Sequence, residues 1–151
     1  MPTIYSYQKY IDPIISRSLR LPEDDNHSPL GTELATIDGI TYVSIPGLTV
    51  LPVNQPQEIS ASIVEVTPTD TLKEAIRQVS PHTKLIAQRI IETIRSHYTI
   101  NDEMYFARIG VGAAMGLYVP STQELQEMTV FGEFVEATRQ WGREQRALLG
   151  L

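Results

Sequence analysis

Residues 80 to 98, SPHTKLIAQRIIETIRSHY, constrain the fold of this chain more than any other stretch. Ser80 is a favourable N-cap, and Pro81 suits the first helical position, where its missing N–H removes no hydrogen bond. Aliphatic residues then recur at steps of three, four and five residues, and these are Leu85, Ile86, Ile90, Ile91 and Ile94. The pattern predicts a helix that buries this stripe against other elements. The chain before it has the composition of strands and loops, and the chain after it that of helices.

The sequence ELATIDGITYVSIPG, residues 33 to 47, predicts a β-hairpin. Asp38-Gly39 lies between two β-rich runs, and a type I′ turn needs positive φ at both of its central residues. The expected cross-strand pairs are Ile37 with Ile40, Ala35 with Tyr42, Thr36 with Thr41, and Leu34 with Val43. Both faces of this hairpin are partly apolar, so we expect both to be covered, by the helices and by something else.

A third strand is predicted over residues 58 to 66, EISASIVEV, whose composition is typical of strands. Prolines at positions 46, 52 and 56 exclude a central strand from the preceding connector. We therefore expect a small antiparallel sheet of three or slightly more strands over residues 32 to 66. A change in composition at residues 67 to 70 marks the start of the helical region, residues 71 to 151.

The first 21 residues are rich in tyrosine and aliphatic residues. Over residues 3 to 9, Ile4, Ser6 and Gln8 alternate with Tyr5, Tyr7 and Lys9, which is consistent with a short strand or an extended arm. Asp12 followed by Pro13 predicts a short helix from residue 13 to about 21. One interpretation is that this segment packs on its own domain. The other is an arm whose tyrosines dock on a partner, since aromatic residues with polar tips are favoured at interfaces.

Three further helices are expected in the C-terminal half. A capping box of Thr71 and Glu74 predicts a short helix that ends at Val79, and Asn101 or Asp102 would cap another from about residue 103 to 109. Glycines at 110, 112 and 116 weaken its far end, so the helix either persists or dissolves before Pro120.

The last helix is the longest, and it is predicted to run from the capping box at Ser121 and Glu124 to about residue 149. Alternating steps of three and four residues form a heptad-like seam of Phe131, Phe134, Thr138, Trp141, Gln145 and Leu148. A helix of this length is long for such a chain. Its far half is therefore a candidate for packing on another subunit.

Composition limits the class of protein. A hydrophobic fraction of 42% over 151 residues fits one globular domain, or two very small ones. The sequence shows no secretory leader or membrane-spanning run, and the absence of cysteine excludes disulfides and thiolate metal sites. The net charge of −6 comes entirely from residues 1 to 70, and an acidic half argues against nucleic acid as the partner. We expect a soluble protein.

No pattern in the sequence predicts catalysis, a cofactor or a metal. The three histidines, His27, His82 and His97, lack the spacing of a metal-binding helix. Gly110, Gly112 and Gly116 follow a predicted helix rather than a strand, so a phosphate loop is not expected there. We therefore expect a protein that is not an enzyme, although an active site can be assembled from residues remote in sequence.

The C-terminal part runs from SPHTKLIAQRI through IRSHYTINDEMYFARIG to FVEATRQWGREQRALLGL. Over residues 71 to 151, the general character of the sequence resembles that of the small accessory proteins encoded with tailed-phage tail and tail-fibre genes, without a diagnostic motif. The resemblance implies a role in virion structure or tail-fibre assembly, located in the virion or the host cytoplasm. It carries over no functional residues.

The sequence thus predicts an α+β protein with a small antiparallel sheet followed by three or four helices, the last one long. Its expected function is contact with other virion proteins or with itself, as a homo- or hetero-oligomer, without nucleic acid or membrane. The alternative is a small cellular adaptor or regulator that oligomerises through its C-terminal helix. The candidate partner-binding residues are Tyr5, Tyr7, Tyr10, Tyr42, Phe131, Phe134, Trp141 and Leu148.

Overall fold

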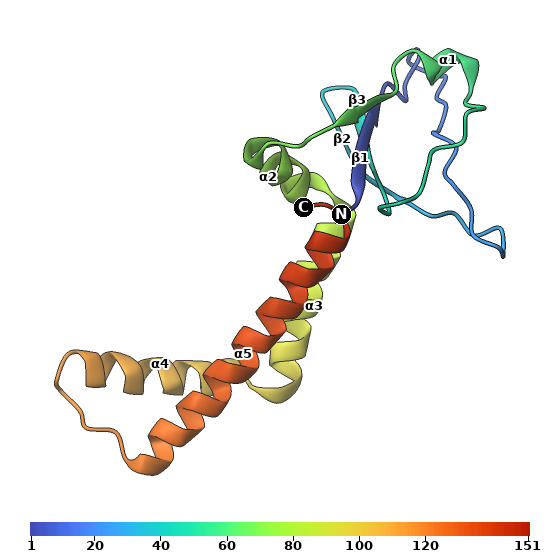
Figure 1. The fold of residues 1–151 in the computed structure, drawn as a ribbon. Helices are drawn as coiled ribbons and strands as arrows, with labels where there is room; N and C mark the ends of the chain where they lie inside the picture. The colour runs from blue at the N-terminus through green and yellow to red at the C-terminus, as the bar shows by residue number, and fades with distance from the viewer. The chain divides into compact units, whose positions relative to one another are not determined.

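The computed structural model describes residues 1–151, and it confirms the α+β class (Figure 1). A sheet of four antiparallel strands in the N-terminal half precedes the main helices, of which the last is the longest. The chain divides into two compact units. Unit 1 contains residues 1 to 85 and 145 to 151, and unit 2 contains residues 86 to 144.

The sheet of unit 1 has the strand order β2-β3-β1-β4. Its strands are β1 (Thr3–Tyr7), β2 (Thr32–Ile37), β3 (Ile40–Ile45) and β4 (Val64–Val66). Strand β1 lies between β3 and β4 and pairs with both, so it is an internal strand of the sheet. The predicted strand near the N-terminus is confirmed, so residues 3 to 7 do not form an extended arm.

The β2–β3 hairpin turns at Asp38 and Gly39, whose φ values of 50° and 79° confirm the predicted positive φ at both central residues. Three of the four predicted pairs are present, and the fourth is wrong because a bulge lies between Glu33 and Ala35. Val43 consequently faces Glu33 instead of Leu34. A bulge interrupts the strict alternation of side chains between the two faces of a strand. Leu34 and Ala35 are therefore both buried, although they are adjacent in the chain.

Gly39→Val is expected to destabilise unit 1 by about 1–2 kcal/mol. No atom lies near a Cβ built on Gly39, so the strain comes from a β-branched residue held at positive φ and not from a clash. Thermal unfolding monitored by circular dichroism measures the effect. Gly39→Asn is the matched control, since asparagine tolerates this conformation, and equal melting temperatures for the two variants would contradict the assigned turn.

Two predicted elements of unit 1 are wrong. No helix forms over residues 13 to 21, because Asp12 Oδ1 accepts the backbone N–H groups of Ile14 and Ile15 at 2.8 Å and closes a turn. The N–H of Arg17 then donates to the carbonyl of Lys9, so the chain reverses direction. Residues 58 to 66 are not one strand. They begin in the short helix α1 (Gln57–Ser60), which buries Ile59, and only the end of the stretch joins the sheet as β4.

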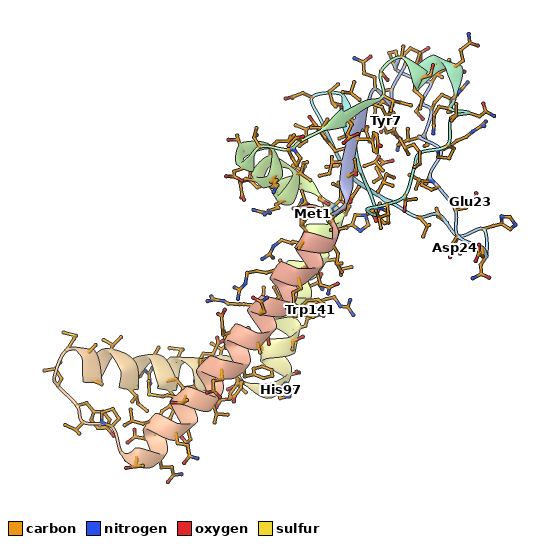
Figure 2. The ribbon with its side chains drawn as sticks, viewed as in Figure 1. Met1, Tyr7, Glu23, Asp24, His97 and Trp141 are labelled. Carbon is orange, nitrogen blue, oxygen red and sulfur yellow. The ribbon has the colours of Figure 1, made fainter.

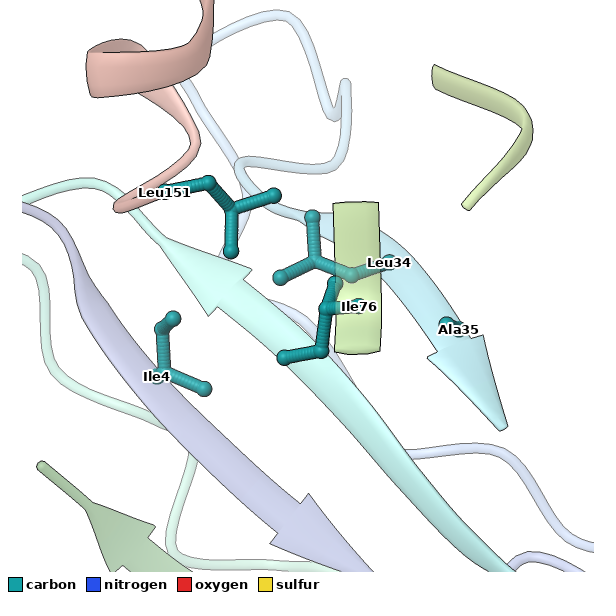
Figure 3. Close-up of a cluster of buried hydrophobic side chains, with 5 residues drawn as sticks. All are labelled: Ile4, Leu34, Ala35, Ile76 and Leu151. Atoms are coloured by element: carbon teal, nitrogen blue, oxygen red, sulfur yellow. The ribbon is translucent and has the colours of Figure 1, made fainter. Parts of the chain in front are cut away.

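Two apolar clusters lie on opposite faces of the sheet. Strand β1 contributes Ile4 to one cluster and Tyr7 to the other, and residues three apart in a strand point to opposite faces. The first cluster is drawn in Figure 3 and consists of Ile4, Leu34, Ala35, Ile76 and Leu151. The second consists of Tyr7, Leu19, Val43, Ile45 and Ile59. Helix α2 (Asp70–Val79) covers the first face, and α1 and loop residues cover the second, so the expected double cover of the hairpin is confirmed.

Helix α3 (Pro81–His97) confirms the central helix, but two details of its prediction are wrong. The Ser80 hydroxyl is buried without a hydrogen-bond partner, so it does not cap the helix. Of the five aliphatic residues only Ile86 is buried, whereas Leu85 and Ile91 are more than half exposed. The cap of α2 also differs, since Thr69 Oγ1 accepts the N–H of Leu72 and the predicted box at Thr71 does not form.

Unit 2 contains α4 (Ile100–Ala114) and the parts of α3 and α5 (Thr122–Leu148) between residues 86 and 144. Helix α4 begins earlier than predicted, because Thr99 and Asp102 form a reciprocal capping box, and it continues through Gly110 and Gly112. The predicted box at the start of α5 is confirmed by hydrogen bonds in both directions between Ser121 and Glu124. None of the helices is both long and apolar enough to cross a membrane.

Candidate interaction surfaces

Unit 2 is held together by an aromatic cluster of Tyr98, Phe106, Phe131 and Phe134. The Phe106 and Phe131 rings stack at 4.8 Å between centroids, and Tyr98 meets Phe131 edge to face at 4.9 Å. Such pairs stabilise beyond their buried area by about 0.5–1.5 kcal/mol each. Two of the predicted partner-binding residues, Phe131 and Phe134, therefore contact rings of their own unit, and each remains only half-buried.

Trp141 lies at the edge of an open groove of about 420 Å³ between α3 and α5 in unit 2. Its indole faces the Arg89 guanidinium at 5.8 Å, which is within the range of a cation–π contact. The groove is lined by Arg89, Thr93, Phe134, Ala137, Thr138 and Trp141. Trp141 and His97 are labelled in Figure 2. A half-buried Trp at the edge of a groove is an amphipathic surface of the kind that protein interfaces use.

The four candidate tyrosines are all in unit 1, and the structure separates them. Tyr7, labelled in Figure 2, is 1% exposed in the core, where burial raises the pKa of its phenol, so a partner cannot reach it in this fold. Tyr5 and Tyr42 are half-buried and pack against the two apolar clusters. Tyr10 is exposed, and of the four it is the one most open to a partner.

Thr138 is one of the two polar members of the predicted seam on α5. Thr138 is buried, and its hydroxyl donates to the carbonyl of Phe134 at 2.9 Å, which satisfies it within the helix. Leu148, the last member, is 69% exposed. The seam thus packs within unit 2 at its aromatic residues and presents an unpacked leucine at its end.

Sequence reasoning missed three exposed apolar segments. The turn after β1 exposes Ile11, Ile14 and Ile15, and the connector after β3 exposes Leu48, Val50 and Val53. The third segment follows the end of α4 and exposes Met115, Leu117 and Val119. The signal in the sequence was the run from residue 104 to 119, in which Arg108 is the one charged residue. Contiguous exposed apolar residues mark interaction sites in soluble proteins.

The ionic contacts are structural in character. The Glu33 carboxylate accepts from Lys9 Nζ at 2.8 Å and raises the pKa of that ammonium, and Glu103 likewise raises the pKa of Arg95 across a 2.8 Å bridge. The Ser121 N–H, together with the Tyr118 hydroxyl, lowers the pKa of Glu124. Each of these contacts fixes a strand edge or a helix terminus.

The Glu124 cap gives a pH-dependent prediction. Because the folded state lowers the pKa of Glu124, its contribution to stability is present above the ordinary value of 4.5 and is lost as the pH falls through the lowered pKa. The Ser121 amide should therefore titrate by NMR with a midpoint below 4.5, and this titration should vanish in Glu124→Gln. Tyr118→Phe removes the second hydrogen bond alone and should move the midpoint part of the way up. A titration that persists in Glu124→Gln, or a midpoint that Tyr118→Phe does not move, would contradict the assignment.

No group of three or more His, Cys, Asp or Glu residues lies in a position to hold a metal ion. The candidate surfaces are apolar and aromatic: the Trp141 groove, the Tyr10 turn with its isoleucines, the connector after β3, and the segment after α4. Comparison with protein-family models, with curated proteins and with solved structures finds no match to this chain.

Proposed function

We propose that this chain is a non-enzymatic structural or assembly protein of a tailed phage, associated with the virion, tail or tail fibre. It acts through protein–protein contacts. The observation that carries the contact role is the distribution of apolar residues, because twelve hydrophobic residues are buried whereas twenty-three large ones are exposed. Scattered apolar residues are normal on any surface, but here many are consecutive in the chain.

The phage setting rests on the resemblance of residues 71 to 151 to tail accessory proteins. The surfaces that support contact with other virion proteins are the Tyr10 turn and the Trp141 groove, since both combine aromatic rings with polar tips. These proposed contacts need no titratable group with a catalytic task. The proposal therefore assigns the protein no substrate and no cofactor.

The second candidate is a small cellular adaptor or regulator that oligomerises through its C-terminal helix. Exposed Leu125, Val130 and Leu148 on α5 favour it, because apolar residues on a helix are normally covered by another element, which here would be a second subunit. The two candidates differ in what travels with the protein in its native extract.

Native size fractionation of the untagged protein from its source, followed by mass spectrometry, tests the proposal. The expected result is migration with a large particle that contains tail or tail-fibre chains. Migration as a small species with nothing attached contradicts the phage role and supports the adaptor. A catalytic turnover found in the purified chain would contradict both.

A further inference from the structure

Helix α4 is apolar on two opposite sides. Its inner side packs within unit 2 through Phe106, Ile109 and Gly110, since Phe106 stacks on Phe131 and a Cβ on Gly110 would contact Met128 at 3.4 Å. Its outer side also lacks charge, although it is open to solvent. A helix that is apolar all round is normally buried all round.

The outer side forms a heptad seam, with alternating steps of four and three residues. Its members are Ile100, Met104, Ala107, Val111 and Ala114, and all five are exposed. Ile100 is 60% and Val111 58% exposed, in a chain whose core residues fall below 10%. In coiled-coil notation they occupy d, a, d, a and d, the positions that a second helix covers. We call these five residues the outer seam.

The charged residues beside the outer seam indicate which kind of helix packs on it. Glu103 occupies a g position and Arg108 the e position five residues later, which is the spacing that joins two parallel, in-register helices by interhelical ion pairs. Arg108 has no ion pair or side-chain hydrogen bond within the chain, and Glu103 uses only Oε2, in its bridge to Arg95. A second copy of α4 supplies a partner for Arg108 and a second partner for Glu103, whose Oε1 is free.

An antiparallel pair does not offer this match. It places e opposite e and g opposite g, and the g positions hold Glu103, Gly110 and Leu117. Glu103 would then face an uncharged residue, and Arg108 would face Asn101, Met115 or another arginine. The charges therefore favour the parallel arrangement, in which the small side chains of Ala107 and Ala114 allow close approach.

We propose that the outer seam of α4 is a self-association surface, on which a second copy of this chain packs its own α4 in parallel and in register. Glu103 of each copy pairs with Arg108 of the other. A four-turn helix pair is a small interface, so we expect reversible dimers with a Kd on the order of tens of micromolar. The proposal uses α4 and not α5, and it does not rest on the proposed function, because its test needs only the purified chain.

Sedimentation velocity of the full chain from about 1 to about 300 μM brackets the expected Kd. The wild type should shift from monomer to dimer over this range. Val111→Lys should weaken association about tenfold or more, because it places a charge in the seam, and its exposed site keeps the fold intact by circular dichroism. Arg108→Glu should also weaken it, whereas Arg139→Glu, the same charge change at an exposed arginine of α5, should not.

Orientation is tested by cysteine cross-linking, since the natural chain has no cysteine. Ala107→Cys should form a disulfide-linked dimer under mild oxidation, because equivalent d residues meet in a parallel pair. Ala113 lies on the same helix and is also exposed, but outside the outer seam, so Ala113→Cys should cross-link far less. A wild type that stays monomeric throughout, an unchanged association in Val111→Lys, or equal cross-linking of the two cysteine variants would each overturn the proposal.

Discussion

Phe131→Ala is expected to lower the free energy of unfolding of unit 2 by about 3 kcal/mol. The Phe131 ring stacks on Phe106 at 4.8 Å and meets Tyr98 edge to face at 4.9 Å, so its removal deletes both contacts and leaves a cavity in the aromatic cluster. Trp141, the sole tryptophan of the chain, lies in unit 2 and reports its unfolding by fluorescence during denaturant titration.

Leu125→Ala is the control for this variant, because Leu125 lies on the same helix and is more than half exposed. It should change the free energy of unfolding by less than about 0.5–1 kcal/mol. Equal losses in the two variants would mean that the cluster does not organise unit 2.

Leu34→Asp is expected to abolish the cooperative fold of unit 1. Leu34 is fully buried next to Ile76, in the same cluster as Ile4 (Figure 3). A carboxylate there would be desolvated without a hydrogen-bond or charge partner. Hydrogen exchange with mass spectrometry, read peptide by peptide, should show the loss of protection in the β2 and β3 peptides.

The same substitution at an exposed leucine separates burial from charge. Leu48→Asp adds an identical charge in the connector of unit 1, where Leu48 is exposed, and it should leave the protection of the strands unchanged. Protection retained in Leu34→Asp would show that this face of the sheet is not the core.

Features with a local cause were predictable from the sequence. The Asp38-Gly39 turn and the Ser121–Glu124 capping box each depend on a few neighbouring residues, and both are present. The α+β class followed from long patterns of composition, and it is confirmed.

Features with a remote cause were not predictable in this way. Strand β1 is internal because β3 and β4 flank it, and the residues near β1 in the sequence do not predict which strands pair with it. A competing turn explains the missing helix over residues 13 to 21, since Asp12 caps a reversal of the chain where the Asp-Pro pair indicated a helix.

The candidate interaction residues were predicted by type but not by exposure. Tyr7 has the chemistry of an interface residue, yet the register of β1 turns it into the core. The stripe of α3 shows the reverse error, because Leu85 and Ile91 have the spacing of core residues and remain exposed. Exposure depends on how many elements share a face, and spacing along one helix does not contain that information.

The discontinuity of unit 1 determines the order in which the chain can fold during translation. Residues 145 to 151 belong to unit 1, and Leu151 packs in the same cluster as Ile4, so this core can close only after the ribosome has made all of unit 2. Unit 2 is a continuous segment of mostly local helical contacts, which form quickly. The helical unit can therefore fold while the face of the nascent sheet that carries Ile4 still lacks Leu151, and in that interval a chaperone would find this face incompletely covered.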